Sequence, residues 1–208
     1  MAQHNVLKHG AVPDGTAVCT GALQSAIDAC ADEGGGTVYI PSGTYCTGPL
    51  FLKSDIALFL ERGAVIRASR DIEDFPVMDD PFAGDKSGET VYASLINGMG
   101  LENVSIGGEG VIDGQGDVWW KLVEEKALSH RRPRLVAFSD CRNLCIEGVT
   151  LVNSPQWTVN PVCCDHVTIR NVTIVNPYDS PNTDGLNPDS CRNVSISDCC
   201  IDVGDDCI

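Results

Sequence analysis

The sequence predicts an all-β fold, a right-handed parallel β-helix with one short helix near its N-terminus. Two observations predict it: brief β-rich runs separated by turn residues, and an internal repeat. A polar residue followed by an apolar-x-apolar pattern occurs in four segments: Asn103-Val-Ser-Ile, Asn143-Leu-Cys-Ile, His166-Val-Thr-Ile and Asn193-Val-Ser-Ile. The last three start at residues 143, 166 and 193, a period in the twenties. Short strands at such a period indicate a solenoid, because one coil cannot bury its apolar side alone and must stack on the next.

A second apolar run follows each of the last three repeats: Val149-Thr-Leu-Val, Val172-Thr-Ile-Val and Cys199-Cys-Ile-Asp. The interval from residue 103 to residue 143 leaves room for one coil and an insertion. Leucine-rich repeats have a similar period, but these segments lack the Leu-x-x-Leu-x-Leu framework, so the β-helix is favoured. Asparagine at the start of a repeat is typical of equivalent turn positions, where it tolerates left-handed backbone or stacks into a ladder.

We expect a single domain over residues 1–208, with residues 1–36 as an N-terminal cap segment and residues 37–208 as coils. The cap contains a helical pattern from Thr20 to Asp32, which Thr20 can cap and the glycines at 34–36 end. Apolar residues recur there at helical spacing: Leu23, Ala26, Ile27 and Cys30.

The first coils are expected from β-rich runs that turn residues such as Pro41 and Gly43 separate. These runs are Thr37 to Ile40, Ile56 to Leu60 and Ala64 to Ile66. Further along the chain, a convincing helical period occurs only from Val118 to Leu128.

The composition and net charge of the chain limit which classes of partner it can bind. Its 208 residues are 43% hydrophobic and 21% charged, which suits a soluble globular protein with a sizeable core. The net charge of −15 disfavours nucleic acid and anionic membranes as partners, because both require a basic surface. No apolar run resembles a signal peptide or a membrane span, so we expect a cytoplasmic protein as the sequence is written, or a secreted one if the N-terminus is processed.

The eleven cysteines do not predict a disulfide framework. Their number is odd, and several fall within apolar strand patterns, where free cysteine acts as a small hydrophobe. We expect reduced thiols, with disulfides in a secreted form as the alternative. The sequence contains no Cys-x2-Cys pair, so a metal site is not expected.

Three aspartates lie about one coil apart. Asp184 precedes Asp205 and Asp206 by nearly one period, and residues one period apart lie on adjacent rungs, about 4.8 Å from each other along the axis. Glycoside hydrolysis with inversion requires two carboxyl groups roughly 6.5 to 9.5 Å apart, and clustered like charges raise at least one pKa. Gly204 suggests a bend that presents both neighbouring carboxylates outward. The acidic pair could equally cap a turn, and the spacing leaves both interpretations open.

The motifs around these aspartates resemble those of the polygalacturonases, glycoside hydrolase family 28. Asn182-Thr-Asp-Gly followed by Gly204-Asp-Asp carries the resemblance, which extends in order over nearly the whole chain. The other matching segments are Phe51-Leu-Lys-Ser, Leu60-Glu-Arg-Gly-Ala, Gly110-Val-Ile-Asp-Gly-Gln-Gly with Trp119-Trp120, and Asn153-Ser-Pro-Gln-Trp-Thr.

The resemblance implies inverting hydrolysis of α-1,4-galacturonosyl linkages in pectin, polygalacturonate or its oligomers. It implies that Asp205 is the general acid, that Asp184 and Asp206 hold and deprotonate the attacking water, and that Asn182 binds substrate beside them. No metal or cofactor is implied, because carboxylates perform the proton transfers. The expected partner is an acidic polysaccharide or oligogalacturonide.

Two motifs of the family are absent from the sequence. Gly-His-Gly and Arg-Ile-Lys lie downstream of the acidic pair in the family, whereas this sequence ends at Ile208. We therefore expect an N-terminal part of a longer enzyme, truncated at its C-terminal end. Two alternatives remain: a pectate-lyase-type eliminase, which requires calcium ligands and an arginine base, and a non-catalytic polysaccharide-binding β-helix or inactive fragment.

Other side chains near these motifs have ambiguous roles. The local basic cluster of Arg131, Arg132 and Arg134 either contacts the anionic substrate or forms a solvated loop. Trp157 either stacks on a sugar or packs, and packing is the favoured interpretation.

Overall fold

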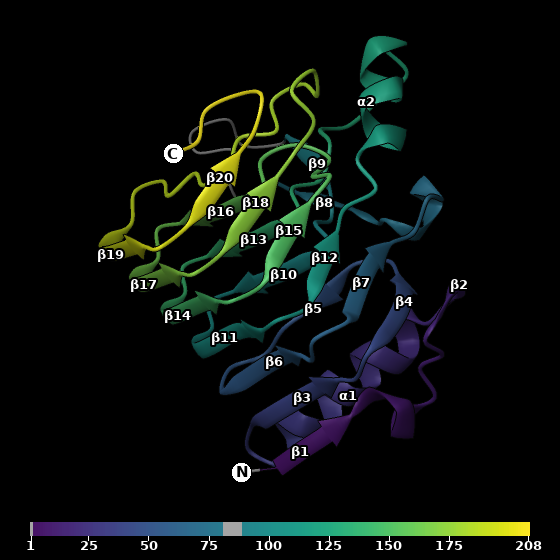
Figure 1. The fold of residues 1–208 in the computed structure, drawn as a ribbon, viewed down its shortest axis with the longest axis vertical. Coiled ribbons are helices and arrows are strands. Elements are labelled where there is room, and N and C mark those ends of the chain that lie inside the picture. Colours follow the sequence, from purple (N-terminus) through teal and green to yellow (C-terminus); the bar gives the residue numbers. More distant parts are fainter. Residues whose placement is uncertain (1, 81–88) are drawn as a thin grey trace.

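The computed structural model describes residues 2–80 and 89–208. The chain winds as a right-handed parallel β-helix, with the two ends of the described chain at opposite ends of the stack (Figure 1). Parallel sheets form three sides of the coils, and we name each sheet after its first strand. The fold class predicted from the repeat is confirmed.

The β1 sheet and the β2 sheet each contain seven strands, and the β5 sheet contains four. The β1 sheet comprises β1 (Ala2–Asn5), β3 (Gly36–Ile40), β6 (Ile56–Leu60), β11 (Glu102–Gly108), β14 (Arg142–Glu147), β17 (Asp165–Arg170) and β19 (Arg192–Ser197). The β2 sheet comprises β2 (Asp14–Val18), β4 (Gly43–Thr47), β7 (Ala64–Ala68), β12 (Val111–Asp113), β15 (Thr150–Val152), β18 (Thr173–Val175) and β20 (Cys200–Asp202). The β5 sheet comprises β5 (Leu50–Phe51), β10 (Ile96–Met99), β13 (Val136–Ser139) and β16 (Val159–Val162).

The remaining elements lie outside the three parallel sheets. Strands β8 (Val77–Asp79) and β9 (Thr90–Tyr92) form an antiparallel pair. The helices are η1 (Val6–His9), α1 (Thr20–Asp32), η2 (Ile72–Asp74) and α2 (Asp117–Glu124). Helix α1 lies at the N-terminal end of the stack, where its apolar side is buried against β1, β3 and β5 (Figure 1).

The repeats align in space as they do in sequence. Val104 pairs with Leu144, Leu144 with Val167, and Val167 with Val194. The second apolar run of each repeat forms β15, β18 and β20, which also pair in register. One coil of the sequence therefore corresponds to one rung of each sheet.

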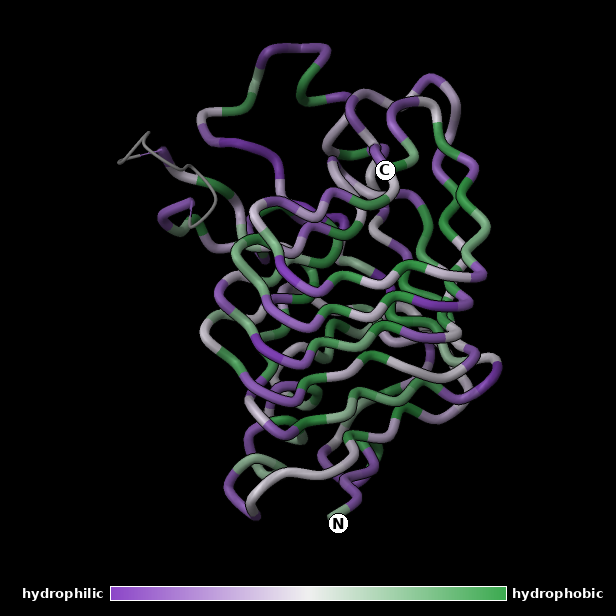
Figure 2. Tube along the Cα trace, turned by 90° about the vertical axis from the view of Figure 1, so that its left-hand side faces the viewer, coloured by the Kyte–Doolittle hydropathy of each residue, from purple (hydrophilic) through white to green (hydrophobic). Residues whose placement is uncertain are grey.

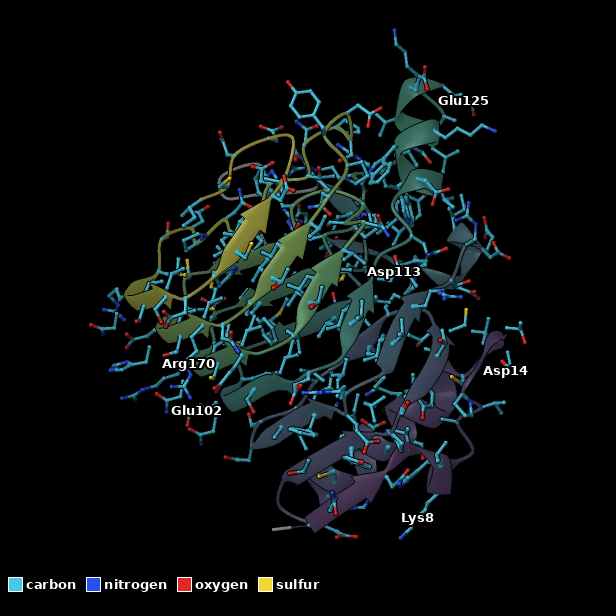
Figure 3. All side chains as sticks on the ribbon, in the orientation of Figure 1. Lys8, Asp14, Glu102, Asp113, Glu125 and Arg170 are labelled. Carbon is cyan, nitrogen blue, oxygen red and sulfur yellow. The ribbon has the colours of Figure 1, made fainter. Side chains whose placement is uncertain are left out.

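The core is a column of apolar side chains between the three sheets. Alternate residues of most strands point inward, as Ile106, Ile146 and Ile169 do at complete burial, and the residues between them are more exposed. Strand β13 is an exception, because all four of its residues are buried. Figure 2 shows the resulting alternation of hydrophobic and hydrophilic residues along stacked rungs. Charged side chains such as Glu102 and Arg170 lie on the outer side of the β1 sheet (Figure 3). Because burial of one such aliphatic side chain stabilises the fold by about 1.5–3 kcal/mol, the stack of rungs is held by the inward positions.

The polar residue at the start of each repeat lies in the left-handed region, at φ values of 56° for Asn103, 58° for Asn143, 59° for His166 and 54° for Asn193. Asn143 Nδ2 donates to Asn103 Oδ1 at 2.9 Å, and Asn103 Nδ2 donates to Asp55 Oδ1 at 2.8 Å. The asparagine side chains therefore link successive coils, as predicted.

The coils have two short corners and one variable corner. From β10 onward, a short turn joins each strand of the β5 sheet to the next strand of the β1 sheet. A second short turn joins that strand to the next strand of the β2 sheet. Each longer segment lies at the third corner, between the β2 sheet and the β5 sheet. These segments are 69–80 with 89–95, 114–135 and 176–185.

Three details differ from the sequence-based expectation. Thr20 is the first helical residue and does not cap α1; its Oγ1 accepts a hydrogen bond from Gly48 N at 2.7 Å. The second helix ends at Glu124, before Lys126 adopts a φ of 54°. Strand pairing also begins within the N-terminal 36 residues, because β1 pairs with β3 and β2 with β4.

All eleven cysteines are free thiols in the structure. Four of them are buried: Cys19, Cys30, Cys141 and Cys164. No helix within the described ranges is long and apolar enough to cross a membrane.

Candidate active site

Asp184, Asp205 and Asp206 lie on segments that continue the β5 sheet beyond β16. Thr158 N donates to Asp184 O at 2.9 Å, which places the segment around Asp184 beside the start of β16. Gly185 N in turn donates to Asp206 O at 2.9 Å. The carboxylates therefore come from two adjacent rungs, as the one-coil spacing predicted.

The three carboxylates converge. One oxygen from each of Asp184, Asp205 and Asp206 lies within 4.8 Å of the other two. These nearest oxygens are closer than the 6.5 to 9.5 Å expected between the two carboxyl groups of an inverting pair. At this distance one water molecule can hydrogen-bond to two of the groups at once, since each such bond is about 2.8 Å long.

The three aspartates differ in exposure. Asp184 is 7% exposed, whereas Asp205 and Asp206 are exposed. Burial raises the pKa of the Asp184 carboxyl, the hydrogen bond from Asn187 Nδ2 at 2.9 Å lowers it, and the charges of Asp205 and Asp206 raise it further; the resulting pKa is above its ordinary value. A raised pKa in the cluster was predicted, and its largest cause is burial.

A hollow of about 340 Å³ adjoins the carboxylates, and we call it the sugar-sized hollow. Trp157, Asn160, Asn187 and Asp206 are among the residues that line it. The Oδ1 atoms of Asn160 and Asn187 are buried and have no hydrogen-bond partner among the residues that the structure describes. Burying an acceptor without a partner costs about 1–3 kcal/mol, so both oxygens lower the stability of this part of the fold.

The family model of the glycosyl hydrolases family 28 matches residues 30–208. The chain belongs to this family. A protein of Vitis vinifera named "Probable polygalacturonase" is 41% identical over 98% of this chain and 43% of its own length. An endo-polygalacturonase of Pectobacterium parmentieri is 31% identical over 92% of this chain and 50% of its own length. The family 28 chain thus spans about half the length of these relatives.

Solved structures show the same coil. An exopolygalacturonase from Thermotoga maritima superposes with a TM-score of 0.85 at 31% identity, over 98% of this chain and 53% of that one. A family 28 exopolygalacturonase of Yersinia enterocolitica superposes with a TM-score of 0.87 at 27% identity, over 99% of this chain and 44% of that one.

Asn182 in the family 28 chain is exposed and in a left-handed turn, at a φ of 53°. Its Oδ1 accepts a hydrogen bond from Arg132 Nη2 at 2.9 Å, and Arg132 Nη1 donates to the carbonyl oxygens of Pro155 and Pro181 at 2.8 Å each. Arg132 thereby ties the Asn182 turn to the preceding coil. Contact between Asn182 and substrate stays a prediction.

The arginine cluster is not a solvated loop. Arg132 is 7% exposed and Arg134 is 1% exposed. The Arg134 guanidinium lies 5.4 Å from the Trp157 ring centroid and 3.3 Å from Asp80, which Arg131 also contacts. These arginines organise the wall beside the sugar-sized hollow, a role that sequence reasoning missed.

Asn176 is a second residue that sequence reasoning missed. It is 4% exposed, and its Nδ2 donates to Thr158 Oγ1 and to Thr183 O at 2.9 Å each, while its Oδ1 accepts from Ser154 N at 2.8 Å. Asn176 therefore holds the residue before Asp184 against the preceding coil. Its place at the end of β18, directly before the Pro177 turn, was the available signal.

Proposed function

We propose that this protein hydrolyses α-1,4-galacturonosyl linkages of pectin, polygalacturonate or their oligomers with inversion. In this proposal Asp205 protonates the leaving glycosidic oxygen, and Asp184 and Asp206 hold and deprotonate the attacking water. The convergence of three carboxylate oxygens within 4.8 Å, beside the sugar-sized hollow, carries the proposal.

The environments of the aspartates support this division of labour. A general base is most effective when its pKa lies near the working pH, and burial raises the pKa of Asp184 in that direction. Asp205 is exposed, so an incoming glycosidic oxygen can reach it. The backbone N–H of Asp206 donates to Asp205 Oδ1 at 3.1 Å and orients that carboxyl.

The sugar-sized hollow supports a carbohydrate substrate. Trp157 lines the hollow and offers an aromatic surface of the kind that packs against a sugar ring. It is partly buried and packs against the Arg134 guanidinium, which agrees with the packing favoured from sequence.

The eliminase alternative requires an arginine that abstracts a proton from the substrate. Arg132 and Arg134 are buried, and their guanidinium groups contact backbone carbonyls and Asp80. This arrangement favours hydrolysis over elimination. The reactions differ in their products, because elimination leaves an unsaturated sugar that absorbs in the ultraviolet and hydrolysis does not.

Reducing-end release from polygalacturonate, with the full-length protein that contains this chain, tests the proposal. We expect Asp205→Asn to lower the rate by about 10²-fold or more, which is the typical contribution of a general acid. The matched control is Asp202→Asn, because Asp202 is an exposed aspartate in the same coil on the β2 sheet. Proton NMR of the first product formed should show the inverted anomer.

Three results would contradict the proposal. Most of the activity could persist in Asp205→Asn, the first product could retain its configuration, or an ultraviolet-absorbing product could accumulate. Oligogalacturonide binding without turnover, unchanged in Asp205→Asn, would support the non-catalytic alternative.

A further inference from the structure

A second hollow, of about 320 Å³, lies on the outward side of the β5 sheet over β5, β10 and β13, and we call it the apolar hollow. Strands β8 and β9 contribute to its wall. Its lining is dominated by apolar side chains, including Phe51, Met78, Val91, Tyr92, Met99 and Leu101. Such a lining favours an uncharged ligand surface.

The described lining of the apolar hollow lacks the available cation that a carboxylate-binding site requires. Among the described residues that line it, Lys53 is the one cation, and its Nζ lies 3.9 Å from Asp28 Oδ1. A galacturonate carboxylate placed here would lose water and meet an ammonium group that another carboxylate already contacts. Burying a charge without a dedicated partner is costly, so the hollow disfavours a free uronate.

The two hollows share one sheet face. In the β5 sheet Phe51 pairs with Asn97, Asn97 with Ala137, and Ala137 with Asn160. The bridge from Val159 to Leu186 places Asn187 next in this column, and Asn187 donates to Asp184. Three strand spacings of about 4.8 Å each separate Asn97 from Asn187. One sugar residue of a 1,4-linked glycan has a similar length, so about three sugars span the distance between these two asparagines.

We propose that the apolar hollow is a specificity subsite for a methyl-esterified galacturonate, about three sugars from the bond that is cleaved. The inference rests on the proposed function and deepens it. The methyl group lies against the apolar wall that Phe51, Met78 and Met99 help to form. Esterification removes the charge that the hollow disfavours, so the protein selects partly esterified pectin with a free uronate at the carboxylates.

Binding of defined hexagalacturonides to the Asp205→Asn protein tests this subsite without cleavage. Three ligands are compared: the unesterified hexamer, and two hexamers in which the three sugars at one end or at the other carry methyl esters. We expect one of the two esterified isomers to bind about fivefold more tightly than the unesterified hexamer, because a buried methyl group and an avoided desolvation both contribute.

Two further substitutions locate the effect. Met99 is 54% exposed, so adding Met99→Lys should leave the fold intact, supply a cation and reverse the preference towards the unesterified hexamer. Val175→Lys is the matched control, because Val175 is 42% exposed on β18 in the β2 sheet.

The outcomes separate the subsite from the proposed function. Cleavage of the unesterified hexamer by the wild-type protein, with no binding preference for either esterified isomer, overturns the subsite alone. An ester preference that Met99→Lys leaves unchanged also overturns it. Absence of hydrolysis of all three hexamers by the wild-type protein overturns the proposed function.

Discussion

Asn176→Ala should both destabilise the fold and disturb the carboxylates. The side chain of Asn176 makes three buried hydrogen bonds, to Ser154 N, Thr158 Oγ1 and Thr183 O. Ser154 and Thr183 are completely buried, so the substitution leaves a backbone N–H and a backbone carbonyl without this partner and away from water. Asp184 follows Thr183 directly and should shift with it.

The expected loss of stability can be worked from the backbone N–H of Ser154 and the backbone carbonyl of Thr183, which the substitution leaves without this partner. Each costs about 1–3 kcal/mol when buried without a partner, so the free energy of unfolding should fall by about 2–6 kcal/mol. For a chain of this size the melting temperature falls by about 2–4 °C per kcal/mol, which predicts a decrease of roughly 4–24 °C. Urea denaturation and thermal melting measure both quantities, and oligogalacturonide binding measures the effect on the site.

The matched control is Asn143→Gly. Asn143 is exposed, donates one hydrogen bond to Asn103 Oδ1, and lies at a φ of 58°, which glycine adopts without strain. Its loss should cost less than about 1 kcal/mol. If Asn176→Ala costs no more than this control, Asn176 does not hold the two coils together and the reasoning fails.

Three further predictions concern the site and the thiols. The pKa of Asp184 is raised in the folded protein, so the stability that this carboxyl contributes is complete below its unfolded-state pKa of 3.8 and is lost as the pH rises through its folded-state pKa. Asp184→Asn should therefore gain stability relative to wild type between pH 3 and pH 7. A constant difference between the urea midpoints of the two proteins over this range would contradict the prediction. Trp157→Ala should weaken oligogalacturonide binding by about tenfold in calorimetry while Trp157→Phe retains most of it, and equal losses would show that ring stacking is not the cause. A thiol reagent should modify exposed Cys163 in the folded protein and buried Cys30 only after denaturation, as mass spectrometry of the labelled peptides can show.

The stacked coils were predictable because their signal is local. Asn143-Leu-Cys-Ile and Asn193-Val-Ser-Ile carry both an alternating apolar pattern and a turn residue, and these two features determine which side chains point inward and where the coil bends. Asp184 and Asp206 were predictable neighbours for the same reason, because a known period converts sequence separation into adjacent rungs.

The surroundings of the carboxylates were not predictable from this pattern. Asn160 and Asn187 come together because of strand register, and neither residue type signals a pocket. Burial of Arg134 against Trp157 depends on contacts from Asp80, a residue of a different coil. Strand β1 also lacks an apolar alternation, and its pairing with β3 supplies the stabilisation that its own composition does not.

The variable corner of the coils has a consequence for how this scaffold can diversify. Helix α2 lies in segment 114–135, which leaves the stack after the β2 sheet and rejoins it at the β5 sheet. A change in the length of the α2 excursion therefore alters the walls beside the coils, while the rung spacing that separates Asp184 from Asp205 stays as it is. Grafting of this excursion should exchange substrate preferences between related chains without replacing the three aspartates.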